Sequence, residues 1–122
     1  MGDAVGLRPL VWIGSAKRDL MKFPDEAIHT IGLVLMRVQY GDTPPSVKPL
    51  RRFGGAGVLE VVEDEDGNAY RVVYTVRLKG RIYVLHAFQK KSTHGIATAK
   101  FDINLIKTRL AWAVELHKEW EK

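Results

Sequence analysis

The sequence predicts an α+β fold, in which an antiparallel β-sheet packs against an N-terminal helical hairpin and a C-terminal helix. Three observations lead to this prediction. Two helical patterns lie near the N-terminus, three strand-like runs separated by turn signals follow, and a long helical pattern comes last. Helices and strands that are segregated along the chain are typical of this class. A length of 122 residues suits a single domain, so we expect one domain over residues 1–122.

The first elements are a short strand and a helix. Residues 9–13 (PLVWI) are apolar and compatible with a β-strand. Ser15 is suited to cap a helix over residues 16–23. Pro24 lacks a backbone N–H and is expected to end that helix.

A second helix is predicted over residues 24–41. Its apolar residues recur at three- and four-residue steps, which gives one apolar face. Gly41 is expected to end it. Residues 42–49 (DTPPSVKP) are rich in turn formers and predict a loop.

Three strands that form an antiparallel meander are predicted next, over residues 58–64, 69–78 and 81–89. The sequence DEDGN between the first two is a strong hairpin signal, and Lys79-Gly80 is a second tight turn. The predicted order of elements is therefore β-α-α-β-β-β-α.

The last helix is predicted over residues 99–120, with Thr98 as its N-cap. It carries two apolar stripes. The first consists of Ile103, Ile106, Leu110 and Val114, and the second of Leu105, Trp112, Leu116 and Trp120. One stripe is enough to dock a helix on a sheet. The second either covers more of the same domain or faces a partner, and we favour the first alternative.

The charge distribution favours a polyanionic partner. The net charge is +5, and no Asp or Glu occurs from Gly67 to Phe101. A segment of one sign produces a local positive field, although solvated Lys and Arg on strands and turns would give the same pattern. The cations of this segment are Arg71, Arg77, Lys79, Arg81, Lys90, Lys91 and Lys100.

Several classes of protein are excluded or disfavoured. The absence of cysteine excludes disulfides, a thiol nucleophile and Cys-based zinc sites. No apolar stretch is long enough to span a bilayer, and the N-terminus lacks a signal-peptide pattern, so we expect a cytoplasmic protein. The four histidines, His29, His86, His94 and His117, have no metal-ligand spacing, and neither GxSxG nor a phosphate loop occurs. We expect no metal and no cofactor.

The hairpin at Lys79-Gly80 predicts where cations gather. Its register places Arg71 opposite about Phe88, close to Lys90 and Lys91, with His94 just beyond. The preceding loop adds Lys48, Arg51 and Arg52, which could reach the same end of the sheet.

Such a cluster suits a phosphodiester. Arginine can contact phosphate with two N–H groups, and a lysine beside other cations has a lowered pKa. A lysine could then act as a base or stabilise the transition state, and a histidine could protonate the leaving 5′-oxygen of RNA. From the residues alone, simple binding of phosphates remains the larger possibility.

The sequence also resembles the HigB-type, phage-derived branch of the RelE superfamily of toxin–antitoxin proteins. The resemblance lies in KPLRRFGGAGVLEV (48–61), YRVVYTV (70–76) and YVLHAFQKKSTHG (83–95), with further matches in order along nearly the whole chain. It implies a metal-independent endoribonuclease toxin that cuts mRNA on the ribosome. It also implies a cognate helix-turn-helix antitoxin of the HigA type.

The resemblance implies catalytic roles for Arg71 and for the basic pair Lys90 and Lys91. RelE itself has lysines where this chain has Glu60 and Val62, and a late tyrosine where this chain has none. His94 is the nearest replacement for that tyrosine. The residues expected to hold RNA or the ribosome are Lys48, Arg51, Arg52, Arg81 and His86. The alternatives are a non-catalytic module that binds RNA or DNA, and a decayed toxin that acts only as a corepressor with its antitoxin.

Overall fold

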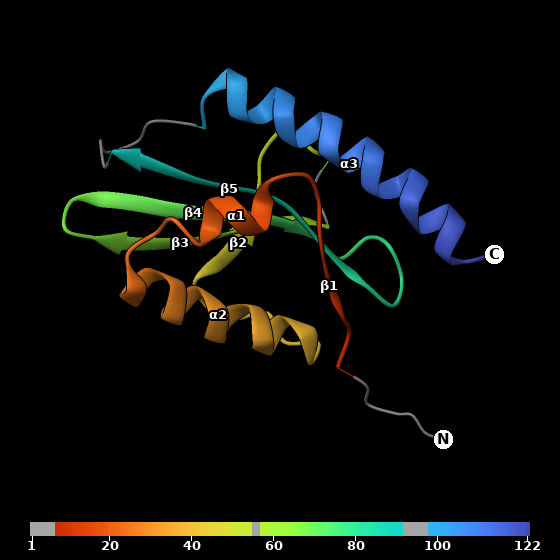
Figure 1. Ribbon diagram of the computed structural model, residues 1–122, viewed down its shortest axis with the longest axis horizontal. Coiled ribbons are helices and arrows are strands. Elements are labelled where there is room, and N and C mark those ends of the chain that lie inside the picture. Colours follow the sequence, from red (N-terminus) through yellow and green to blue (C-terminus); the bar gives the residue numbers. More distant parts are fainter. Residues whose placement is uncertain (1–6, 55–56, 92–97) are drawn as a thin grey trace.

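A computed structural model, which describes residues 7–54, 57–91 and 98–122, contains a five-stranded sheet between two helical layers (Figure 1). Helices α1 and α2 cover one face of the sheet, and α3 covers the other. The α+β class is confirmed. The elements are β1 (Leu10–Trp12), α1 (Ala16–Leu20), α2 (Asp25–Gln39), β2 (Val47–Pro49), β3 (Val58–Glu65), β4 (Asn68–Thr75), β5 (Ile82–Lys91) and α3 (Lys100–Trp120).

The strand order is β1-β5-β4-β3-β2, and two of its features differ from the sequence prediction. The sheet is mixed, because β1 runs parallel to β5 while the other pairs are antiparallel. The predicted loop over residues 42–49 also contains a strand, since Val47–Pro49 pairs with β3. β2 lies at the edge of the sheet, where proline is tolerated.

Two apolar cores fill the space between the layers. Apolar side chains of α1 and α2, such as Leu20 and Ile31, pack on Val72 and Val84 of the sheet. On the opposite face, α3 buries Ile103 and Ile106 of its first predicted stripe, together with Ala113, against the sheet. Leu110 and Val114 of that stripe are only half-buried. Alternation along the strands therefore supplies apolar residues to both faces, as expected for a sheet covered on both sides.

The second stripe of α3 is largely exposed, contrary to the alternative favoured from the sequence. Trp112, Leu116 and Trp120 are exposed, and Leu105 is half-buried. The predicted caps also differ. Ala99 rather than Thr98 precedes α3, and the hydroxyl of Ser15 makes no capping hydrogen bond in α1.

Among the described helices, none combines the length and the apolar character needed to cross a membrane.

A β-bulge in β5 determines which of its residues face α3. Val73 pairs with His86, whereas Tyr74 pairs with Val84, so Leu85 is an extra residue in β5. Strict alternation would place His86 on the same face as Val84. The bulge instead turns His86 and the following alternate residues toward α3.

Candidate active site

Arg71 lies in β4 directly opposite Phe88 of β5, as the hairpin register predicted. Directly paired residues project to the same side of a sheet, so both side chains lie on the face that α3 covers. There the Arg71 guanidinium meets the carboxylate of Glu60 in β3, and Nη1 lies 3.3 Å from each carboxylate oxygen. Both side chains are largely buried, with exposed fractions of 16% and 5%. The Nε of Arg71 is also buried and has no hydrogen-bond partner within the described part of the chain.

Lys90 lies on the same face, two residues beyond Phe88 and opposite Ala69. Burial lowers the pKa of Lys90, and the nearby charge of Arg71 lowers it further. The carboxylates of Asp102 and Glu60 oppose this shift. These influences show that one ammonium, one guanidinium and two carboxylates share a small region near the start of α3.

His86 contacts two residues of this region, Asp102 and Phe88. Its Nε2 lies 2.8 Å from Oδ1 of Asp102, and its ring stacks on Phe88 with centroids 4.7 Å apart. Nη1 of Arg109 lies 3.5 Å from Nδ1 of His86. A guanidinium only donates hydrogen bonds, so this network assigns the proton of a neutral imidazole to Nε2, which donates it to Asp102. We call Glu60, Arg71, His86, Lys90 and Asp102 the Arg71 cluster.

Arg109 of α3 connects His86 of the cluster with Ser15, which directly precedes α1. It is buried in α3 and donates hydrogen bonds to the carbonyl of Leu85 (3.0 Å) and the hydroxyl of Ser15 (2.9 Å). Ser15 in turn donates to Asp19 (2.7 Å), and this bond is the main reason why the pKa of Asp19 is lowered. The carbonyl and hydroxyl contacts satisfy a charge that would otherwise be costly to bury.

The sequence prediction did not include Asp102 and Arg109. One signal was available for Arg109, because Ile106, Arg109 and Ala113 follow one another at three- and four-residue steps on the buried side of α3. A charged residue at such a position requires buried polar partners.

The other predicted residues are distributed as follows. The backbone of Lys48 lies opposite Glu60 in the register of β2 and β3, so both side chains project to the same face of the sheet. Arg51 and Arg52 lie exposed in the turn after β2. Arg81 lies at the opposite end of β5, where its guanidinium stacks on Trp120. Lys91 ends β5 opposite Asn68, but its side chain and the whole of His94 lie outside the described residues. His86 is buried, which agrees with a packed residue better than with one that touches RNA.

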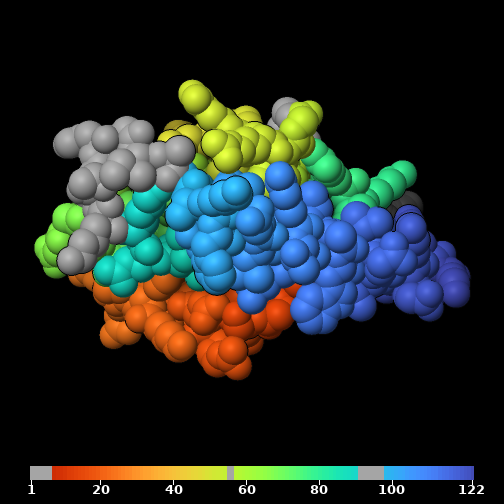
Figure 2. Space-filling view, turned by 90° about the horizontal axis from the view of Figure 1, so that it is seen from above, coloured from red at the N-terminus to blue at the C-terminus, as the bar shows by residue number. Residues whose placement is uncertain are grey.

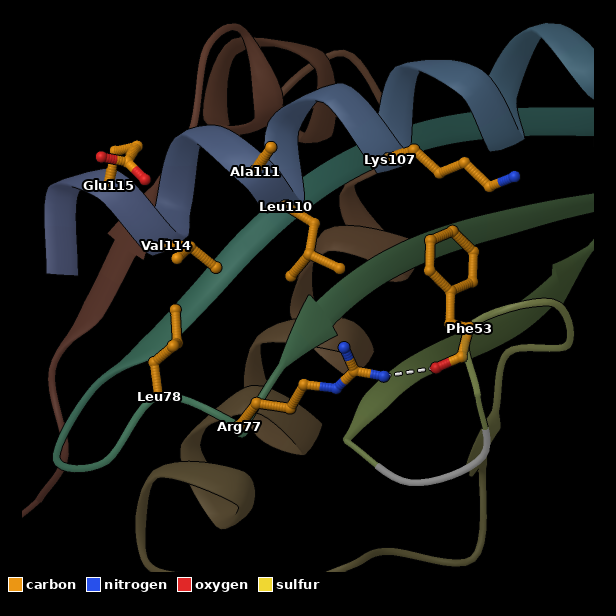
Figure 3. Close-up of a pocket in the computed structure, with 8 residues that line it drawn as sticks. All are labelled: Phe53, Arg77, Leu78, Lys107, Leu110, Ala111, Val114 and Glu115. Carbon is orange, nitrogen blue, oxygen red and sulfur yellow. Dashed lines mark hydrogen bonds between the residues drawn. The ribbon is translucent and has the colours of Figure 1, made fainter. Parts of the chain in front are cut away.

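Figure 2 shows α3 beside the turn that follows β2, and a separate hollow of about 410 Å³ lies along this side of the helix. It is lined by Phe53, Arg77, Leu78, Lys107, Leu110, Ala111, Val114 and Glu115 (Figure 3). Within the part of the chain that the structure describes, no three or more His, Asp or Glu side chains are arranged so that they could hold a metal ion.

Comparisons with known proteins identify one family. A family model described as "Phage derived protein Gp49-like" matches residues 18–111. No curated protein matches the sequence. Among solved structures, a chain of the toxin–antitoxin complex RelBE2 from Mycobacterium tuberculosis is similar, with 19% identity and a TM-score of 0.49. That similarity covers 71% of this chain and 100% of the other.

Proposed function

The chain belongs to the Gp49-like family of phage-derived proteins, and we propose that it is the toxin of a toxin–antitoxin pair. We propose further that it is of the HigB type and that it cleaves mRNA on the ribosome, in the cytoplasm. Its partner would be a helix-turn-helix antitoxin of the HigA type. The sequence resemblance supports the family and the partner, and the Arg71 cluster supports the chemistry.

The observation that carries this proposal is the adjacency of Arg71 and Lys90 on the face covered by α3. A guanidinium can stabilise a phosphorane, while a lysine whose pKa is lowered can exchange a proton at a pH closer to neutral. Glu60 contacts Arg71 through Nη1 alone, so the guanidinium keeps N–H donors that Glu60 does not use.

In the proposed reaction, the 2′-oxygen of a ribose attacks the adjacent phosphorus. Lys90 in its neutral form accepts the 2′-hydroxyl proton, and Arg71 stabilises the negative charge on the phosphorane. The bond from phosphorus to the 5′-oxygen then breaks, and that oxygen takes a proton from His94. The products are a 2′,3′-cyclic phosphate and a free 5′-hydroxyl. Lys91 and Lys48 would hold the neighbouring phosphates, and no metal is required.

The experiment is induction of the protein in growing bacteria, followed by mapping of the 5′ ends of transcripts. We expect new ends within translated frames for the wild-type chain and none for Arg71→Ala. Arg37→Ala is a matched control, because Arg37 also pairs with a carboxylate but lies exposed on α2, on the other face of the sheet. Intact transcripts and normal growth at confirmed expression of the wild-type chain would refute the nuclease.

A binding module is the competing function, and the buried Glu60 beside Arg71 is the observation that favours it. That carboxylate reduces the positive charge available to a transition state. A non-catalytic protein would bind RNA but leave transcripts intact, so the same experiment separates the two functions.

A further inference from the structure

The hollow beside α3 has an apolar floor and two cations at its edge (Figure 3). Phe53, Leu78 and Leu110 contribute to the floor, and Arg77 and Lys107 supply the charges. These residues come from the turn after β2, the connection between β4 and β5, and the middle of α3. Its volume of about 410 Å³ is within the range of small-ligand sites.

The Arg77 side chain is held in place by its surroundings. Its Nη2 donates a hydrogen bond to the carbonyl of Phe53, which places the guanidinium at the edge of the hollow (Figure 3). A Cβ atom at Gly57 would collide with the aliphatic part of this side chain, so Arg77 packs directly on the Gly57 backbone. Thr75 reinforces the arrangement, because its hydroxyl donates to the Gly57 carbonyl at 2.6 Å and accepts from the Arg77 backbone N–H at 3.2 Å. The positive charge therefore has a fixed position.

We propose that this hollow is a second nucleotide subsite, which holds the base of a nucleotide near the cleaved bond and contacts a phosphate through Arg77 and Lys107. The inference rests on the proposed function, since it assumes that the Arg71 cluster engages RNA. An apolar floor with cations at its edge suits a nucleotide, whose flat base is largely apolar on its faces and whose phosphate is anionic. Glu115, at the end of the hollow, can accept a hydrogen bond from an exocyclic amino group of a base.

The position of the hollow favours RNA over an acidic peptide. Asp102 is the residue of α3 that belongs to the Arg71 cluster. The residues of α3 that line the hollow begin five positions later, at Lys107. At about 1.5 Å per helical residue, the hollow extends from roughly 8 Å to roughly 20 Å beyond Asp102 along the helix axis. Lys48 lies opposite Glu60 in the sheet, and the exposed Arg51 and Arg52 directly precede Phe53, which lines the hollow. A single strand that enters the cluster can therefore continue into the hollow along a basic surface.

The test measures binding of a hexanucleotide in which every ribose is 2′-O-methylated, so that it cannot be cleaved. Fluorescence anisotropy is recorded for the wild-type chain, Lys107→Glu and Ala111→Trp. The first variant reverses one charge at the edge, and the second fills the hollow from an exposed helical position. Lys17→Glu is the control, because Lys17 is an exposed lysine of α1, on the other face of the sheet.

We expect each of the two hollow variants to weaken binding about 5- to 20-fold, and the control to change it less than about 2-fold. Lys107→Glu should also reduce the slope of log affinity against log salt by about one. Equal affinities for wild type, Lys107→Glu and Ala111→Trp would overturn the subsite. Normal RNA binding by these variants, combined with lost binding of a glutamate-rich peptide, would instead identify the hollow as a peptide site and overturn the proposal. Because the oligonucleotide is not cleaved, the outcome is independent of whether the wild-type chain cuts transcripts.

Discussion

Replacement of Arg71 by methionine is expected to destabilise the fold strongly, because it leaves the Glu60 carboxylate buried without its partner. The two charges lie 3.3 Å apart, which corresponds to an attraction of about 5 kcal/mol at an effective dielectric constant of about 20. Desolvation of both groups offsets much of this attraction. Removal of one partner of a buried pair nevertheless costs about 3–5 kcal/mol, and we expect a loss in this range.

The loss of stability on breaking an ion pair depends more on the burial of the two side chains than on the distance between them. Arg37 and Asp42 lie closer together, at 2.6 Å, but their side chains are 54% and 48% exposed. Solvent screens an exposed pair of this kind, so Arg37→Met should change the free energy of unfolding far less than Arg71→Met does. The shorter ion pair is therefore expected to be the weaker one.

A double-mutant cycle measured by urea denaturation tests this reasoning. Glu60→Leu alone should also be costly, since it leaves a buried guanidinium. The double variant Arg71→Met/Glu60→Leu should lose about 1 kcal/mol or less, because apolar replacements of both partners are often neutral. Additivity of the two single effects within about 0.5 kcal/mol would show that the pair does not interact as described.

The double variant is also useful for the function. It is expected to fold but lacks the guanidinium, so transcript cleavage should disappear without a loss of stability. Cleavage by a folded double variant at the wild-type rate would refute the role of Arg71 in the reaction.

Three further predictions concern stability. Burial and the charge of Arg71 lower the pKa of Lys90 in the folded chain below the ordinary value of 10.5. Between these two pKa values the unfolded chain holds more protons than the folded chain, so the free energy of unfolding should rise with pH across this window. Lys90→Met should abolish that rise and increase stability at neutral pH, as measured by urea denaturation at several pH values. Ser15→Ala removes the hydrogen bond that is the main cause of the lowered pKa of Asp19. The ionised Asp19 stabilises the fold above pH 3.8, and this contribution is lost as the pH falls through the lowered pKa. The variant should therefore begin to unfold at a higher pH than the wild-type chain in an acid titration followed by circular dichroism. Gly14→Ala should cost about 1–3 kcal/mol in thermal unfolding, because φ is +57° and the new Cβ would lie 3.0 Å from Nε of Arg109.

The sequence was sufficient to predict the elements that depend on local signals. Asp66-Gly67 and Lys79-Gly80 were recognised as the two turns. The predicted register placed Arg71 opposite Phe88, but the pairs beside the second turn are offset by one residue, and only the bulge at Leu85 gives the predicted pairing at Arg71. β2 was missed because a strand of three residues that contains Pro49 has no recognisable alternation. The parallel pairing of β1 was missed because it depends on the path of the chain around α1 and α2, which no local pattern specifies.

The polar part of the site was harder to predict. Arg109 and Asp102 lie in a helix whose sequence is consistent with exposed charges, and only the packing of α3 across β5 places them against Leu85 and His86. Glu60 lies in an alternating strand and was noted only as a departure from relatives. Its role as the partner of Arg71 follows from the register between β3 and β4, in which Glu60 and Arg71 lie diagonally on one face.

The bulge at Leu85 explains why the cations meet at all. Without the extra residue, Phe88 and Lys90 would continue the alternation of Val84 and face the apolar core beneath α1 and α2. On that face Lys90 would lie away from Arg71 and from Glu60 and Asp102, the charged groups that act on it on the α3 face. With the bulge, both residues turn toward Arg71, and the apolar core on the other face closes over Ala87. A single additional residue in β5 thus separates an apolar face that stabilises the fold from a charged face that is suited to bind phosphate.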